Sequence, residues 1–216
     1  MADVVALIDG FNLYHALDGR SHYGGGYPYH KYKWIDYSEL ARCFVPRSDR
    51  LVEVVLFTAS PPWPGADGKR KRQAALIDAN RDLGVLVVWG RFRPVDKVCT
   101  LEVPHARIVY PTYEEKRTDV AIAVGLVGRA YRKAYGKAVI ISGDSDLIPA
   151  IQEAKTAHPN GAIISVVPIE HRGQALKNEV DLQIAMKAKH LAASRLPDPF
   201  TLRSGQVVHC PQSWKP

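Results

Sequence analysis

The stretch AVIISGDSDLIPAIQEA, residues 138–154, decides how the chain can fold. Its first four residues, 138–141, form an apolar run that predicts a buried strand, and the amphipathic pattern from Leu147 onward predicts a helix. Two acids, Asp144 and Asp146, lie between them. In open α/β sheets the ligand crevice lies beyond the carboxyl ends of the strands. The stretch therefore places carboxylates where such a protein binds its ligand.

Apolar runs alternate with helical patterns along most of the chain, which is typical of a parallel sheet covered by helices on both faces. The predicted strands are residues 4–8, 51–58, 85–89, 138–141 and 162–167. The predicted helices are residues 37–44, 67–83 and 118–135. The sequence thus predicts an α/β fold whose central, mostly parallel sheet of about five strands is flanked by helices.

Three regions depart from this alternation. Residues 20–33 are rich in Gly, Tyr, His and Arg and predict a mobile loop, whereas residues 98–110 predict a β-hairpin or another excursion from the sheet. The Pro-rich C-terminal stretch predicts extended structure. We expect one domain at residues 1–195 and an extended C-terminal tail at residues 196–216.

Composition narrows the class of protein. A chain of 216 residues can bury a proper core. It has no run of about 18 apolar residues, so we expect no transmembrane helix and no membrane partner, and its start lacks the pattern of a secretory signal. Three scattered cysteines without a Cys-x-x-Cys pair argue against a zinc knuckle. These features favour a cytoplasmic protein.

The net charge favours an anionic partner. Lys and Arg number 29 against 22 Asp and Glu, which gives a formal charge of +7. Nucleic acid suits such a surface, because neutralising phosphates releases counterions. The simpler interpretation is a set of solvated basic side chains, so charge alone does not decide between them.

Another acid ends the first predicted strand. Asp9 follows the apolar run at residues 4–8, Gly10 allows a tight turn, and Asn12 can donate a hydrogen bond back toward the strand end. The simpler interpretation is that Asp9 or Asn12 only caps the next helix. A shared site gains weight because Asp144 ends another strand in the same way.

Asp119 begins the longest predicted helix, where the helix dipole favours a carboxylate. The structural alternative is that Thr118 caps this helix and Asp119 is only a first-turn acid. If the acids meet in one crevice, their repulsion raises their pKa values and a divalent cation removes that cost. Oxygen ligands suit Mg²⁺ or Mn²⁺ better than Zn²⁺. We predict Asp9, Asp119, Asp144 and Asp146 as metal ligands.

Three ordered motifs, IDGFN at residues 8–12, EKRTDV at 115–120 and SGDSD at 142–146, resemble the NYN domain family of PIN-like ribonucleases and its LabA-like (DUF88) branch. The resemblance covers most of the chain, from about residue 3 to 195. It implies a PIN-like α/β sandwich with a metal-dependent ribonuclease site. The family's acids match Asp9, Asp119, Asp144 and Asp146, with Asn12 beside them.

The chain departs from the family pattern at one position. Many relatives carry a further acid in the long helix where this chain has Gly125. A missing carboxylate would weaken a second metal site, and a glycine inside a helix costs about 1 kcal/mol relative to alanine. Asp181 matches a frequent acid of the family, and we interpret it as a supporting residue.

Two basic clusters are candidates for contacts with substrate. Lys69, Arg70, Lys71 and Arg72 form a dense run that could hold a phosphate backbone or could be a solvated helix face. Arg91 and Arg93 flank Phe92, which could stack an unpaired base or belong to the core. We predict the six basic residues as substrate-binding.

The leading hypothesis is a metal-dependent endoribonuclease that hydrolyses single-stranded or structured RNA through metal-activated water. Asp9, Asp119 and Asp144 are the expected ligands. Asp146 is an outer ligand or general base, or it caps the following helix, and Asn12 orients substrate or water. The alternative is a weakly active or inactive module that binds RNA or protein.

A minor alternative is an NADH-linked oxidoreductase, although no Gly-x-Gly-x-x-Gly follows a strand. Whether the protein forms a homo-oligomer stays open.

Overall fold

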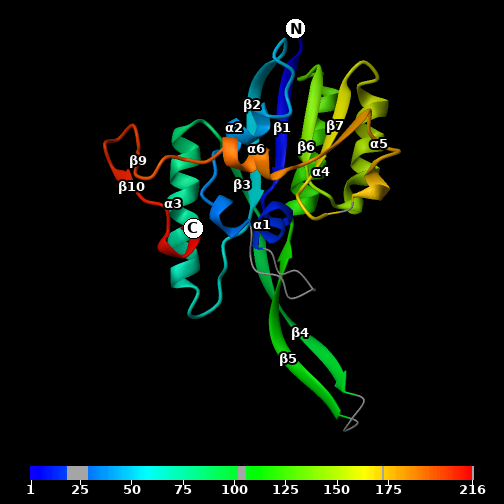
Figure 1. Cartoon of the computed structure of the whole chain (residues 1–216). Helices are drawn as coiled ribbons and strands as arrows, with labels where there is room; N and C mark the ends of the chain where they lie inside the picture. Colours follow the sequence, from blue (N-terminus) through cyan, green and yellow to red (C-terminus); the bar gives the residue numbers. More distant parts are fainter. Residues whose placement is uncertain (19–28, 102–105, 172, 216) are drawn as a thin grey trace.

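A six-stranded sheet forms the centre of the computed structural model, which describes residues 1–18, 29–101, 106–171 and 173–215. Every neighbouring pair of strands is parallel, in the order β3-β2-β1-β6-β7-β8 (Figure 1). This confirms the predicted α/β fold, with one strand more than expected. The strands are β1 (Asp3–Asp9), β2 (Arg50–Thr58), β3 (Leu86–Trp89), β6 (Lys137–Ile141), β7 (Ala162–Val167) and β8 (Leu182–Ala185).

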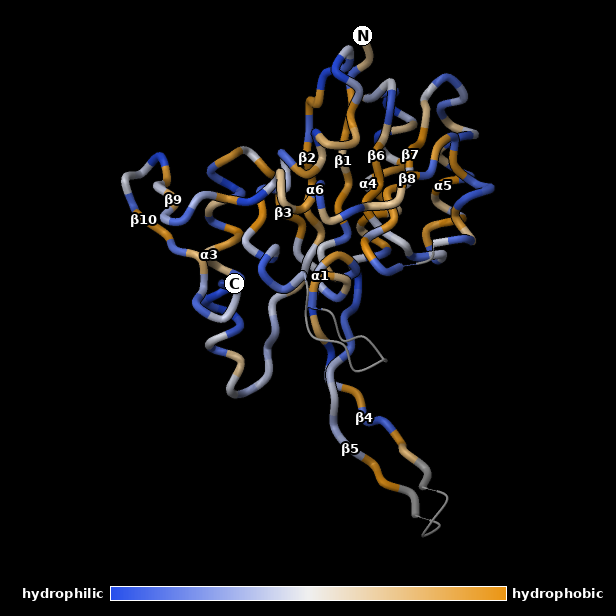
Figure 2. Tube along the Cα trace, viewed as in Figure 1, coloured by the Kyte–Doolittle hydropathy of each residue, from blue (hydrophilic) through white to orange (hydrophobic). Residues whose placement is uncertain are grey.

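Helices cover both faces of the sheet, as predicted. Alternate side chains of β1 enter two separate cores: Val5 and Leu7 pack under α4 (Thr118–Tyr131) and α5 (Ile148–Ala157), whereas Ile8 packs on the opposite side. Figure 2 shows the hydrophobic residues gathered along the central strands. The helices of the opposite side are α1 (Gly10–Asp18), α2 (Tyr37–Arg42), α3 (Asp67–Asp82) and α6 (Ala188–Ala193).

Two boundaries differ from the sequence prediction. The long helix α4 ends at Tyr131 rather than at residue 135, because Lys133 has a φ of 51° and Ala134 N–H donates to Arg129 O at 3.0 Å. The strand β8 was not predicted, since it has four residues, none of them fully buried. The short 3₁₀ helices are η1 (His30–Tyr32), η2 (Ser145–Leu147), η3 (Gln174–Leu176) and η4 (Gln212–Trp214).

A long antiparallel hairpin, β4 (Arg91–Leu101) and β5 (Ala106–Lys116), projects from the body of the molecule (Figure 1). A hairpin was predicted here, but it begins much earlier than residue 98. Arg91 and Arg93 therefore start β4 and do not end β3. At the hairpin's base, Gly90 has no room for a side chain, since a Cβ would lie 2.5 Å from Thr118 Oγ1.

The C-terminal residues contribute to the core on the α1 side of the sheet. Phe200 and Trp214 are buried there, and Trp34 Nε1 donates to Pro197 O at 2.9 Å. Two short strands, β9 (Phe200–Thr201) and β10 (Val207–Val208), pair antiparallel within this segment. A separate tail starting at residue 196 stays a prediction.

Two further expectations concern loops and membranes. Residues 20–28 of the predicted mobile loop lie outside the described residues, and His30–Tyr32 of its remainder form η1. Across the parts of the chain that the structure describes, no helix combines the length and apolar character needed to cross a bilayer.

Candidate functional site

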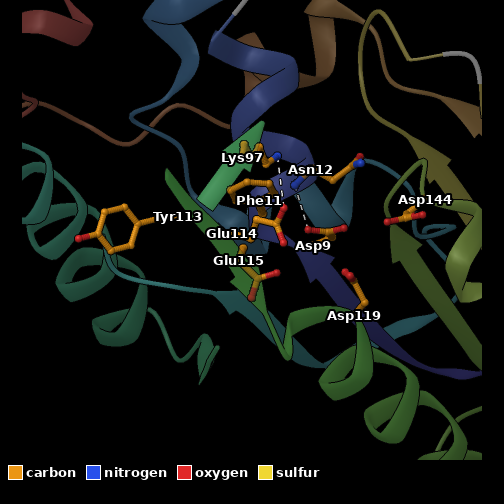
Figure 3. A pocket seen from close by; sticks show the side chains of 9 residues that line it. All are labelled: Asp9, Phe11, Asn12, Lys97, Tyr113, Glu114, Glu115, Asp119 and Asp144. Atoms are coloured by element: carbon orange, nitrogen blue, oxygen red, sulfur yellow. Dashed lines mark hydrogen bonds and ion pairs between the residues drawn. The ribbon is translucent and has the colours of Figure 1, made fainter. Parts of the chain in front are cut away.

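The strand order reverses between β1 and β6, and a pocket of about 380 Å³ lies near the carboxyl ends of these two strands (Figure 3). Ile8 is in register with Ile141, so Asp9 and the Asp144 turn emerge side by side. Such reversal points are where open α/β sheets bind ligands. The pocket is lined by Asp9, Phe11, Asn12, Lys97, Tyr113, Glu114, Glu115, Asp119 and Asp144.

Asp9 is the buried acid of the pocket, with only 3% of its surface exposed. It accepts hydrogen bonds from Asn12 N–H and from the Ser142 hydroxyl, both at 2.9 Å. Burial raises the pKa of Asp9 to about 6; the two hydrogen bonds act against this rise, and the charges of Asp119 and Asp144 add to it. An ionised carboxylate here is costly unless a cation joins it.

Hydrogen bonds join the two strand ends. Asn12 Oδ1 accepts from Gly143 N–H at 3.1 Å, so its side chain fixes the turn after β6. Ser142 Oγ, which donates to Asp9, also accepts from Asp144 N–H at 3.1 Å. Ser142 was not predicted to matter, although it directly precedes the Gly-Asp pair. The turn after β1 is equally tight, because a Cβ on Gly10 would lie 2.8 Å from a β2 carbonyl oxygen.

Asp144 and Asp146 differ in position. Asp144 lines the pocket, and its Oδ1 accepts from Asp146 N–H at 2.9 Å, which caps η2. The expectation that Asp146 might be the cap is wrong, because the cap is Asp144. Asp146 is exposed and lies outside the pocket lining, yet its charge contributes to the raised pKa of Asp119.

Asp119 lies in the first turn of α4 and lines the pocket. Burial, followed by the charges of Asp144, Glu115 and Asp146, raises its pKa. Thr118 is not the helix cap, since the cap position is Arg117 with a φ of 84°. The Thr118 hydroxyl and N–H instead donate to the Glu115 carboxylate.

Two pocket acids, Glu114 and Glu115, were not among the predicted site residues. They enter because β5 returns from the hairpin directly beside α4. Lys116 and Lys97 lie 3.0 and 3.3 Å from Glu114 and hold its pKa below the usual range. Only their place next to Asp119 in the sequence could have suggested them.

Three further residues clarify the edge of the site. A Cβ on Gly143 would lie 3.3 Å from His171 Nδ1, so His171 is a neighbour that the sequence did not reveal. Gly125 faces the core, where a Cβ would lie 3.2 Å from Phe57 Cζ. A side chain at 125 would therefore meet the core first. Asp181 supports the sheet by accepting from Ile163 N–H at 2.7 Å.

None of the predicted basic residues lines the pocket. Arg70 donates to the carbonyls of Pro61 and Trp63 at 2.9 and 3.3 Å, so it fixes the loop before α3. Lys69 Nζ lies 5.5 Å from the centre of the Trp63 ring. The remaining side chains reach solvent: Lys71, Arg91 and Arg93 are exposed and Arg72 is half-buried.

The donor chemistry of the pocket fits a hard divalent cation, since its acids offer only oxygen. Burial, and to a smaller extent the charges of neighbouring acids, raise the pKa values of Asp9 and Asp119, and a bound cation would offset both costs of ionising them. Within the described residues, no three His, Cys, Asp or Glu side chains already form a coordination group. Among the described residues, the carboxylates that line the pocket do not already meet at a single coordination point.

Comparisons with known proteins agree with this architecture. The model of the NYN domain family matches residues 3–168. A crystal structure of a protein of unknown function from Vibrio parahaemolyticus has a similar fold, with a TM-score of 0.56 and 14% sequence identity over 87% of this chain and 94% of that chain. No curated protein shows a significant sequence match. The family match spans most of the chain and all three motifs, and the protein is a member of the NYN domain family.

Proposed function

We propose that the protein is a metal-dependent endoribonuclease that hydrolyses RNA phosphodiesters at the acidic pocket. The observation that carries the proposal is that Asp9, Asp119 and Asp144 come from three distant segments and surround one pocket where the strand order reverses. The NYN family has a PIN-like nuclease fold, and its members are generally ribonucleases that use divalent metals.

Asp9, Asp119 and Asp144 would hold Mg²⁺ or Mn²⁺, with Asp146 as an outer ligand or general base. When bound, such a cation lowers the pKa of a water molecule and offsets charge on the phosphoryl oxygens. Asp146 is exposed in the first turn of η2, two residues after Asp144.

Asn12 would orient the substrate. Its Oδ1 accepts from Gly143 N–H, so its amide NH₂ group is the part that can donate to a phosphate oxygen. The bond to Gly143 also fixes the side chain on the frame of the sheet, which reduces the cost of positioning the scissile phosphate.

Basic side chains of α3 and of the start of β4 would contact the RNA backbone. Arg91 and Arg93 at the base of the hairpin are exposed, as are Lys69 and Lys71 on α3. Phosphate contacts of this kind position nucleic acid without reading its sequence. Arg72 is half-buried and joins this set, whereas the guanidinium of Arg70 primarily holds the loop before α3.

The test is cleavage of end-labelled RNA by purified protein in Mn²⁺, in Mg²⁺ and in chelator. We expect cutting that needs a metal and is lost in Asp9→Asn and Asp144→Asn. Asp78→Asn is the matched control, because Asp78 is an exposed acid on α3 outside the pocket. Cleavage that continues in chelator, or that is unchanged in both pocket variants, would overturn the proposal.

A second candidate is an RNA-binding module with little or no activity. Gly125, which stands where many relatives carry a further acid, favours it. Under this alternative the protein retains RNA in every metal tested and releases it uncut, and Asp9→Asn binds as tightly as the native chain.

A further inference from the structure

Four aromatic side chains form a continuous strip beside the acidic pocket. The ring centres of Phe11 and Phe92 are 6.2 Å apart, those of Phe92 and Trp63 are 5.1 Å apart, and those of Trp63 and Tyr113 are 5.2 Å apart. Phe11 and Tyr113 also line the pocket (Figure 3). These residues, hereafter the aromatic strip, come from α1, from the loop between β2 and α3, and from both strands of the hairpin.

The aromatic strip belongs to neither hydrophobic core. Phe11 and Tyr113 are 39% and 36% exposed, while Trp63 and Phe92 are half-buried against their ring neighbours. Both cores contain other side chains only. The sequence left Phe92 between a core role and a surface role, and the structure assigns it to the surface. Contiguous exposed apolar groups beside a pocket are typical of a binding surface.

The loop that carries Trp63 is held from several sides. Arg70 binds two of its carbonyls, and Gln73 Nε2 donates to Ala59 O at 3.0 Å. Gly90 N–H, at the base of the hairpin, donates to Thr58 O at 2.8 Å. The rings therefore occupy set positions before any ligand arrives, and pre-organised groups lose less entropy on binding.

We propose that the aromatic strip stacks the unpaired bases of single-stranded RNA next to the cleavage site, with Lys69 contacting the backbone beside Trp63. The proposal rests on the proposed ribonuclease function for the identity of the ligand. The acids lie beside Phe11 and Tyr113, which line the pocket, whereas the Lys69 ammonium lies beside Trp63, which does not. An RNA strand held by Lys69 at Trp63 would therefore cross the neighbouring rings on its way to the acids of the pocket.

The strip also predicts which form of RNA is bound. Every base has an aromatic face, so stacking on protein rings tolerates any sequence. In a duplex the bases already stack on one another, and their faces are unavailable. We therefore expect a preference for unpaired RNA with little dependence on sequence.

The experiment measures the binding of a fluorescent single-stranded 12-nucleotide RNA, and of the same strand in a duplex, by anisotropy in chelator. We expect the native protein to prefer the single strand. Trp63→Leu removes the ring but keeps an apolar side chain, and should weaken single-strand binding roughly ten-fold, since one stacked base contributes about 1–3 kcal/mol. Trp63→Phe keeps a ring and should restore most of the affinity.

Tyr131→Leu is the matched control, because Tyr131 is 64% exposed on α4 and lies outside the strip. If Trp63→Leu does not fold, as judged by circular dichroism, Tyr113→Leu tests the same strip from the hairpin. Equal binding of single strand and duplex, native affinity in the leucine variants, or no RNA binding at all would overturn the proposal. The last result would point to a protein partner.

The experiment separates this inference from the proposed catalysis. Binding in chelator involves no cleavage, so a protein that never cuts RNA can still show RNA binding that depends on the aromatic strip. If the protein cuts RNA in Mn²⁺ but binds RNA equally well without the Trp63 ring, the result would support the proposed ribonuclease function and contradict the proposed stacking surface.

Discussion

The two strand ends that meet at the pocket carry the same residue in different surroundings. Asp9 is almost fully buried and accepts two hydrogen bonds, whereas Asp144 is half-buried and accepts one, from Asp146 N–H. Burial raises the pKa of Asp9 to about 6, so the ionised form of Asp9 lowers the free energy of unfolding. Asp144 instead helps to form its own turn. Identical carboxylates in one pocket therefore have opposite relations to stability.

The largest expected effect is on catalysis, where the two acids should agree. Asp9→Asn and Asp144→Asn should each lower metal-dependent RNA cleavage by about three orders of magnitude, because a cation supplies several kcal/mol of charge stabilisation. Single-turnover cleavage rates measure this. A large loss in one variant alone would show that only that acid serves the reaction.

Metal binding should also depend on both acids. A ligand present at about 100 times its Kd stabilises the folded chain by roughly 2.7 kcal/mol. We expect Mn²⁺ to raise the melting temperature of the native protein and of Asp78→Asn. The rise should vanish in Asp9→Asn and in Asp144→Asn. An undiminished Mn²⁺ response in either pocket variant would remove that residue from the ligand set.

Without metal, the two variants should differ in stability. The pKa of Asp9 is about 6 in the folded chain against an ordinary value of 3.8, so its ionised form lowers the free energy of unfolding above pH 6. This cost fades as the pH falls toward 3.8. Asp9→Asn should therefore stabilise the chain by about 3 kcal/mol at pH 7.5, and by about 1 kcal/mol at pH 4.5.

The matching measurement is denaturant unfolding in chelator at both pH values. Asp144→Asn should stay within about 0.5 kcal/mol of the native chain, because the asparagine oxygen can still accept from Asp146 N–H. A gain in Asp144→Asn as large as in Asp9→Asn would contradict the contrast between the two sites.

The smallest expected effect concerns the residue that links the two acids. Ser142→Ala removes a donor to Asp9 and an acceptor of Asp144 N–H, and should cost about 1 kcal/mol. It should also raise the pKa of Asp9 further. Unfolding free energies measured with Ser142→Thr, which restores a hydroxyl, check that the hydrogen bonds are responsible.

The strand ends could be predicted from the sequence because their signals are local. An apolar run followed by Gly and Asp marks both turns, and parallel strands bring such turns to one edge of the sheet. The identity of the cap after β6 could not be predicted, since Asp144 and Asp146 are equally suitable capping residues.

Other features depend on contacts that no local pattern records. Glu115 reaches the pocket and accepts from Thr118 N–H only because β5 returns to the body beside Gly90. The strand β8 is too short and too exposed to show a period. The core positions of Phe200 and Trp214 depend on the packing of the C-terminal segment against residues far away in the sequence.

The tight contact between Gly90 and Thr118 has a consequence for how the molecule can vary. The chain leaves the body at Gly90 and rejoins it at Thr118, where a glycine Cβ would already be too close. The hairpin between them is thus an excursion from the sheet, and its two ends lie in close contact at Gly90 and Thr118. Each residue removed from both of its strands shortens its reach by about 3.4 Å, while the sheet and Asp9 stay in place. The length of the arm can thus change without any change to the fold beneath it.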